Sequence, residues 1–131
     1  MIEIEFVVWE FVRLMVALED AKDRNLPGGV YAAWQAPWQE IDNRLTKLGG
    51  SDAEGFAQLM MNQTISVSCG RPQHLSDAID ALENVIDALK VDIAHAKDDA
   101  EQEAELSFEL AELVELVDRL RAIDPAMISD D

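Results

Sequence analysis

The chain of 131 residues has few cysteine, aromatic and basic residues. The shortage of cysteine argues against a disulfide-stabilised protein, and the shortage of basic residues argues against a nucleic-acid-binding one. The single cysteine, Cys69, cannot form a disulfide within the chain, which favours a reducing, cytoplasmic location. Lys and Arg number 10 against 27 Asp and Glu, so the formal net charge is −17. A surface this negative repels phosphate groups, which argues against direct binding to nucleic acid or to an anionic membrane.

Long apolar runs are also missing. The stretch richest in apolar residues is 2–18, and charged residues such as Glu10 and Arg13 interrupt it, so it is too polar to span a membrane. The N-terminus begins with acidic Glu3 and Glu5 and lacks the basic segment of a signal peptide. We therefore expect a soluble, cytoplasmic protein.

The composition is typical of a single globular domain. Apolar residues make up 49% of the chain and charged residues 28%, which is enough apolar material to bury a core. A chain of this length forms one domain without disulfide or metal support. We expect this domain to cover residues 1–123, followed by a disordered acidic tail at 124–131.

The longest stretch without an internal glycine or proline runs from Pro72 to Ile123. Its apolar residues recur at alternating steps of four and three, the spacing of one helix face, in two series that are out of phase. This phase change predicts two antiparallel helices, at about 73–97 and 100–123, with Asp98 or Asp99 capping the second. One long helix in a dimeric coiled coil is the competing interpretation. The two series are Leu75, Ile79, Leu82, Ile86, Leu89, Ile93, Ala96 and Ala100, then Leu106, Leu110, Leu113, Val117 and Leu120.

The preceding half of the chain predicts shorter helices. Apolar spacing predicts a helix at about 3–24, although the alternation at its start would also suit a short strand. A second helix, at about 31–48, is expected to kink or to begin at Pro37. A third, at about 52–63, follows a predicted capping box from Ser51 to Glu54.

Residues 64–69 alternate polar and apolar side chains and are expected to form an extended connector or a last irregular turn. The predicted fold class is therefore all-α. We expect a bundle of four to five helices with a long C-terminal antiparallel helical hairpin.

Acidic residues gather in this C-terminal half. Fourteen Asp and Glu side chains lie between residues 72 and 118, against only Lys90 and Lys97. At about 100° per residue, five glutamates share one side of the last predicted helix, with few basic residues spaced to pair with them. One interpretation is a solvated face that keeps the protein soluble. The other is a surface for a basic partner, formed by Glu101, Glu105, Glu109, Glu112 and Glu115.

Phe108 and Leu116 are expected to project on the same side as these glutamates, and Val91 among the aspartates of the preceding helix. Binding energy at protein interfaces concentrates in a few aromatic or apolar contacts. Phe108, surrounded by carboxylates, is therefore a candidate anchor for a partner. The alternative is that Phe108 packs beneath another helix of this chain.

The sequence contains no complete motif for a metal or cofactor. Asp92 and His95 lie on one helix face, but a di-iron bundle requires that pair twice, with two further glutamates. There is no zinc spacing and no glycine-rich phosphate loop. His74 lies near Cys69 in sequence, but no third group completes a catalytic set. We expect no cofactor, no metal and no enzymatic activity.

Two acidic pairs, Glu109-x-x-Glu112 and Glu115-x-x-Asp118, resemble those of the all-α nucleotide pyrophosphohydrolases of the MazG-like group. The resemblance implies carboxylates that hold magnesium ions, which activate water against a phosphate chain. It covers ten residues. Here both pairs lie on one predicted helix, whereas that family places its pairs on separate helices.

The favoured hypothesis is a non-enzymatic acidic binding protein that docks on the basic surface of a nucleic-acid-binding protein. It would act as an inhibitor, a nucleic-acid mimic, or an immunity or anti-defence protein, and its binding would be sensitive to salt. One alternative is a structural subunit that forms a homodimer through the apolar seam at 75–100. The other is a MazG-like nucleotide pyrophosphohydrolase.

Overall fold

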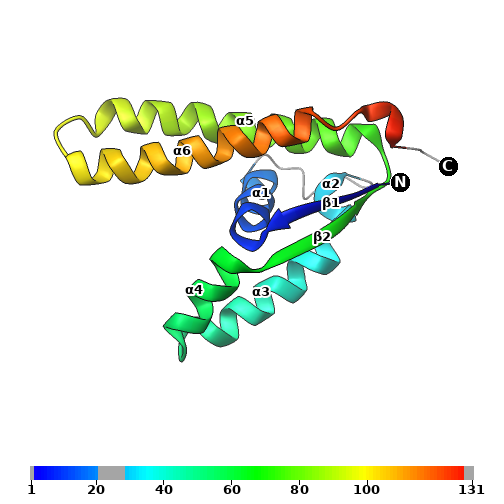
Figure 1. The fold of residues 1–131 in the computed structure, drawn as a ribbon, viewed down its shortest axis with the longest axis horizontal. Coiled ribbons are helices and arrows are strands. Elements are labelled where there is room, and N and C mark those ends of the chain that lie inside the picture. Colours follow the sequence, from blue (N-terminus) through cyan, green and yellow to red (C-terminus); the bar gives the residue numbers. More distant parts are fainter. Residues whose placement is uncertain (1, 21–28, 129–131) are drawn as a thin grey trace.

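The computed structural model describes residues 2–20 and 29–128, and within these ranges the chain is mostly helical. The fold is roughly the predicted all-α class, with one small antiparallel sheet that was not predicted. Figure 1 shows the two longest helices side by side above the sheet, and a shorter helix pair below it. In chain order the elements are β1 (Ile2–Val7), α1 (Val8–Asp20), α2 (Val30–Ala33), α3 (Gln35–Gly49), α4 (Ala53–Asn62), β2 (Thr64–Cys69), α5 (Pro72–His95), α6 (Ala100–Arg121) and the 3-10 helix η2 (Pro125–Met127).

The sheet joins the start of the chain to a segment about sixty residues later. Strand β1 runs antiparallel to β2, with Ile4 opposite Val67. Within β1, Ile4 and Phe6 are buried whereas Glu3 and Glu5 are exposed, as the period of two requires. The sheet therefore places one apolar face on the core.

This pairing corrects two predictions. The helix expected at 3–24 begins only at Val8, and the segment before it is a strand; residues 21–24 lie outside the described residues. The connector expected at 64–69 is the second strand. Neither segment is strongly specified alone, because a strand is stabilised by cross-strand contacts that local periodicity does not contain.

Glu10 holds the junction between β1 and α1. Glu10 is only 4% exposed, and its carboxylate accepts a hydrogen bond of 2.8 Å from the backbone N–H of Val7. This is the backward-reaching half of a capping box. The same carboxylate accepts a hydrogen bond of 3.1 Å from Arg119 of α6. A buried carboxylate is tolerated here because it has both a backbone donor and a cation.

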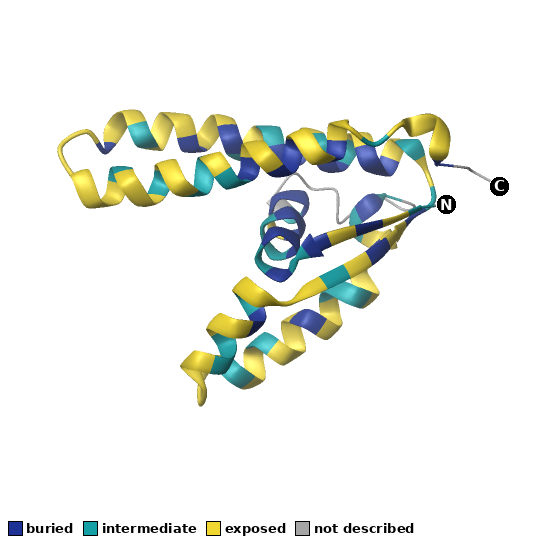
Figure 2. Cartoon of the chain, viewed as in Figure 1, coloured by how far each residue is buried: buried dark blue, intermediate teal, exposed yellow. Residues whose placement is uncertain are grey.

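The main core lies between α1, the sheet and the α5–α6 pair, where Figure 2 concentrates the buried residues. Phe6, Phe11 and Trp34 form a cluster with ring centroids 5.8 to 6.4 Å apart. The Trp34 indole Nε1 donates a hydrogen bond of 2.9 Å to the carbonyl oxygen of Ser68. The indole therefore fills the core and also fixes β2 against the α2–α3 junction.

The helix expected at 31–48 is divided at Trp34 and not at Pro37. Trp34 lies between α2 and α3 with φ −104° and ψ 10°. Pro37 falls in the first turn of α3, where its missing N–H would have no partner within the helix. The proline thus agrees with a helix start a little earlier than its own position.

Helix α4 is capped by Asp52, so the predicted capping box from Ser51 to Glu54 is wrong by one residue. The Asp52 carboxylate accepts a hydrogen bond of 2.9 Å from the backbone N–H of Gly55. The Ser51 hydroxyl instead donates to the carbonyl of Lys47 near the end of α3. Helices α3 and α4 enclose a smaller second core centred on Val8, Ile41 and Leu59.

Helices α5 and α6 and the turn between them carry fourteen of the 27 acidic residues. The chain turns after His95, and α6 returns along α5 (Figure 1), with Asp99 accepting a hydrogen bond of 3.1 Å from the backbone N–H of Gln102. The apolar seam considered above for a dimer is largely buried within this chain, at Leu75, Leu82, Ile86, Leu89 and Ala96. The half of the pair nearest the turn projects beyond the rest of the fold.

The C-terminal segment returns to the core. Asp124 accepts a hydrogen bond of 2.9 Å from the backbone N–H of Ala126 at the start of η2, and Ile128 is buried in the main core. Residues 124–128 of the predicted disordered tail therefore have a defined structure. Residues 129–131 lie outside the described residues.

The structure predicts that Glu10 is important for stability. We expect Glu10→Ala to lower the free energy of unfolding by about 1–3 kcal/mol, because the Val7 N–H and Arg119 both lose their acceptor. Glu10→Gln should lose less, because its amide oxygen still accepts from the backbone. Urea unfolding followed by circular dichroism measures both variants, and wild-type stability of Glu10→Ala would contradict this role.

Candidate partner-binding surface

Helix α6 has a buried side and a separate acidic side. Leu113, Leu116, Val117 and Leu120 are buried against the fold. Another side carries residues that recur at steps of four, three, four and three, which places them in one line along the helix. We call this line the acidic stripe; it consists of Glu101, Glu105, Phe108, Glu112 and Glu115.

The carboxylates of the acidic stripe are largely free. Three of them are exposed and Glu112 is half-buried. None of the four forms an ion pair with any residue that the structure describes. Like charges three or four residues apart destabilise a helix by a few tenths of a kcal/mol per pair, so this arrangement has a cost in the isolated protein.

Glu109 lies apart from the acidic stripe, unlike the arrangement expected from sequence. Its carboxylate approaches Nε of Arg13 in α1 to 2.7 Å. Arg119 of α6 pairs in the opposite sense with Glu10 of α1 at 3.1 Å. Glu109 therefore contributes to holding α6 against α1.

The exposed apolar residues only partly match the prediction. Phe108 is 63% exposed and Val91 is 56% exposed, so Phe108 does not pack beneath another helix among the described elements. Leu116, which was expected to project beside Phe108, is fully buried and that prediction is wrong. The apolar side of α6 is wider than the four-three series indicates.

The four acids that resemble a MazG-like magnesium site do not converge. Glu109, Glu112, Glu115 and Asp118 follow one another at intervals of three residues, so each is turned about 60° from the last and the set covers half the helix circumference. Glu109 is also engaged by Arg13. Within residues 2–20 and 29–128, no group of three or more His, Cys, Asp or Glu side chains could hold a metal ion.

Several residues that shape this surface were not identified from the sequence. Arg119 lies four residues after Glu115, at the next step of the stripe, and this spacing indicates that a basic side chain ends the acidic line. The pairing of Arg13 with Glu109 had no sequence signal, because the two residues are far apart in the chain and α1 was not placed on α6. Val114, which is 39% exposed, was detectable as an apolar residue outside the four-three series.

Comparison of the chain with models of known protein families finds no match, and comparisons with curated proteins and with solved structures find none either. Among the described residues, no helix is both long enough and apolar enough to cross a membrane.

Cys69 is fully buried at the end of β2, and its thiol donates a hydrogen bond of 3.4 Å to the carbonyl of Arg71. Burial raises the pKa of the Cys69 thiol. We expect Ellman's reagent to react with Cys69 much more slowly in the native protein than in urea.

The Cys69 thiol ionises at lower pH in the unfolded chain than in the folded one. The free energy of unfolding that this thiol contributes should therefore fall as the pH rises through the ordinary thiol pKa. Rapid native labelling would contradict this assignment.

Two truncations test the two apolar environments on α6. We expect Phe108→Ala to change the free energy of unfolding by less than about 0.5 kcal/mol, because the ring is mostly exposed. Leu116→Ala should cost about 2–5 kcal/mol, because it leaves a cavity in the core. Chemical denaturation measures both, and a large loss for Phe108→Ala would mean that the ring packs within the fold.

Proposed function

We propose that this protein is a non-enzymatic acidic binding protein that docks on the Lys/Arg-rich surface of a nucleic-acid-binding protein. The observation that carries the proposal is the acidic stripe itself, in which four carboxylates without described ion-pair partners flank the exposed ring of Phe108. The protein would act as an inhibitor, a nucleic-acid mimic, or an immunity or anti-defence protein. The single buried thiol of Cys69 agrees with a cytoplasmic location.

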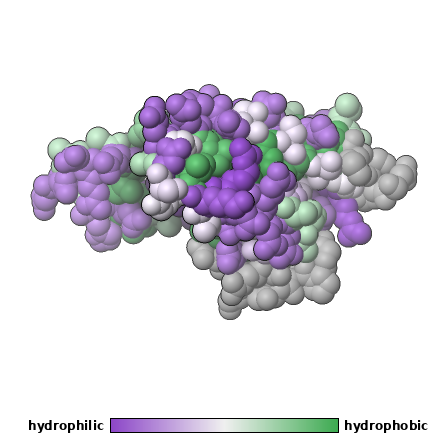
Figure 3. All heavy atoms as spheres, turned by 90° about the horizontal axis from the view of Figure 1, so that it is seen from below, coloured by the Kyte–Doolittle hydropathy of each residue, from purple (hydrophilic) through white to green (hydrophobic). Residues whose placement is uncertain are grey.

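In this proposal α5 and α6 act as an antiparallel helical hairpin mounted on a small helical bundle. Figure 3 shows that the projecting half of the pair, at the left, is mostly hydrophilic, which is the character expected of a surface that meets a charged partner. The helix holds the stripe in one line, so little conformational entropy is lost when a partner binds it.

The spacing of the charges supports a basic partner. From Glu101 to Glu115 the stripe spans about 21 Å, at 1.5 Å per residue, and holds four carboxylates. One strand of B-DNA carries about six phosphates over the same length, at about 3.4 Å each. Other acids of α6 and of the turn before it add to the field: Asp98, Asp99, Glu103 and Asp118. The combined potential is of the sign that attracts a phosphate-binding surface.

Charge and aromatic area have different roles in such an interface. An exposed ion pair contributes only about 0.2–1 kcal/mol, so the carboxylates mainly accelerate association and select basic partners. Burial of Phe108 provides a non-polar contact of the kind that dominates interface energy. A solvated face that served solubility alone would need no aromatic ring in the middle of the carboxylates.

Charge reversal tests the proposal. We expect Glu105→Lys with Glu112→Lys to weaken binding of a fluorescein-labelled octa-arginine peptide by about tenfold or more, because two contacts become repulsive. The matched control is Glu40→Lys with Glu54→Lys, which makes the same charge change on exposed residues of α3 and α4. Fluorescence anisotropy measures all three proteins.

Salt provides the second part of this test. Raising NaCl from about 50 mM to about 300 mM should weaken wild-type binding more than binding by the stripe variant, because screening acts on the contacts that the variant has lost. Equal affinities for the stripe variant and the control variant would contradict the proposal. Absence of peptide binding by the wild-type protein would contradict it as well.

A further inference from the structure

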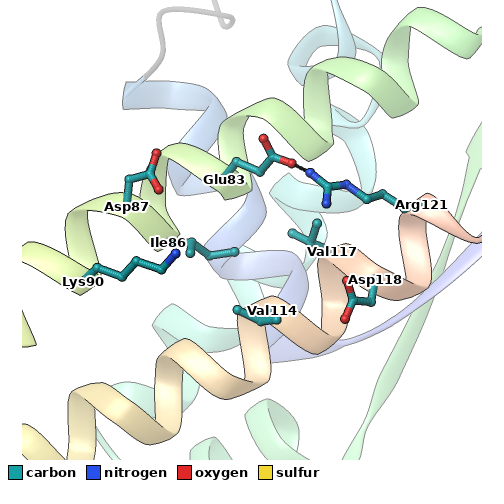
Figure 4. Close-up of a pocket in the computed structure, with 8 residues that line it drawn as sticks. All are labelled: Glu83, Ile86, Asp87, Lys90, Val114, Val117, Asp118 and Arg121. Carbon is teal, nitrogen blue, oxygen red and sulfur yellow. Dashed lines mark ion pairs between the residues drawn. The ribbon is translucent and has the colours of Figure 1, made fainter.

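A groove of about 250 Å³ lies between α5 and α6, separate from the acidic stripe (Figure 4). Ile86, Val114 and Val117 provide its apolar lining, and Val114 keeps 39% of its surface exposed. Asp87 and Asp118 lie at its border and form no ion pair with any residue in the described part of the chain. The groove thus combines an apolar floor with free carboxylates.

One guanidinium already lies in this groove. Arg121 extends from α6 and forms an ion pair with Glu83 of α5, as Figure 4 shows. Both side chains remain partly exposed, so the pair contributes little to stability. Lys90 also lines the groove, but no ion pair within the described ranges fixes its ammonium. The groove is therefore chemically suited to a guanidinium, and its present occupant is weakly held.

We propose that the groove receives an arginine side chain of the basic partner, which displaces Arg121 from Glu83. This inference rests on the proposed function and names the contact that gives it side-chain specificity. The aliphatic stem of the arginine packs on Val114 and Ile86, and its guanidinium meets the Glu83 and Asp118 carboxylates.

The size and chemistry of the groove favour this occupant over two others. Small-molecule sites usually enclose about 300–1,000 Å³, and this groove is smaller. A lysine ammonium is a compact, strongly hydrated charge, whereas a planar guanidinium binds carboxylates through two hydrogen bonds and tolerates apolar contact. An arginine therefore uses both the floor and the border of the groove.

The decisive variant removes the internal occupant. Arg121→Gln should increase the affinity for octa-arginine by about three- to fivefold, because Glu83 no longer has to be released from its ion pair. Arg44→Gln is the matched control, since it removes one exposed positive charge from α3 and should change affinity less than about twofold. Octa-lysine should gain less than octa-arginine from Arg121→Gln.

Methyl NMR locates the contact independently of affinity. In the wild-type protein, octa-arginine should shift the Val114 and Ile86 methyl signals, and Asp118→Asn should reduce those shifts. Circular dichroism verifies that each variant is folded. Unchanged Val114 and Ile86 signals at saturating peptide, or equal effects of Arg121→Gln and Arg44→Gln, would overturn the arginine assignment.

The two proposals fail in different ways. If Glu105→Lys with Glu112→Lys abolishes binding, and saturating octa-arginine leaves the Val114 and Ile86 signals of the wild-type protein unchanged, the acidic stripe binds a basic partner and the groove does not take part. If octa-lysine shifts the groove signals as strongly as octa-arginine, the groove accepts any cation and the inference is wrong. If neither peptide binds, both proposals are wrong.

Discussion

The constraint on which this structure depends is that α5 and α6 can bury only part of their length. Beside α1 and the sheet, both helices place apolar side chains in the main core, including Leu75 and Leu82 of α5 and Leu116 and Leu120 of α6. Toward the turn each helix has mainly the other to pack against, and exposed side chains dominate (Figure 2). Burial of apolar surface therefore anchors one half of the pair, while the other half remains available to solvent or to a partner.

The same division determines which charges are paired. Where α6 passes α1, the two helices exchange ion pairs in opposite senses, Arg13 with Glu109 and Arg119 with Glu10. The glutamates of the acidic stripe lie on the same helix as Glu109, but none of them has an ion-pair partner among the described residues. The acidic stripe thus arises because the other elements of the fold do not cover this side of α6. Arg119 is spaced to reach Glu115 but pairs with Glu10 instead, so the four carboxylates of the stripe form no ion pair within the described residues.

A stripe and a groove on one helix pair suggest a division of roles in recognition. Exposed carboxylates act over about a Debye length and select partners by charge, whereas the ring of Phe108 and the apolar floor around Val114 require close contact. Either feature alone has an ordinary explanation, since acidic faces improve solubility and single exposed apolar residues are common. Their occurrence on one helix pair supports the proposal that this pair binds a partner.

Local information in the sequence was sufficient for the long helices. Apolar spacing and the Asp99 cap predicted helices at 73–97 and 100–123, close to the observed Pro72–His95 and Ala100–Arg121, because helix periodicity and capping depend on neighbouring residues. The exposure of Phe108, the burial of Leu116 and the pairing of Glu109 with Arg13 were decided only by the tertiary structure. The tertiary structure also decided the pairing of β1 with β2, where the sequence had predicted a helix from residue 3. Each of these depends on a residue from a distant part of the chain, and the sequence alone does not show which distant surfaces meet.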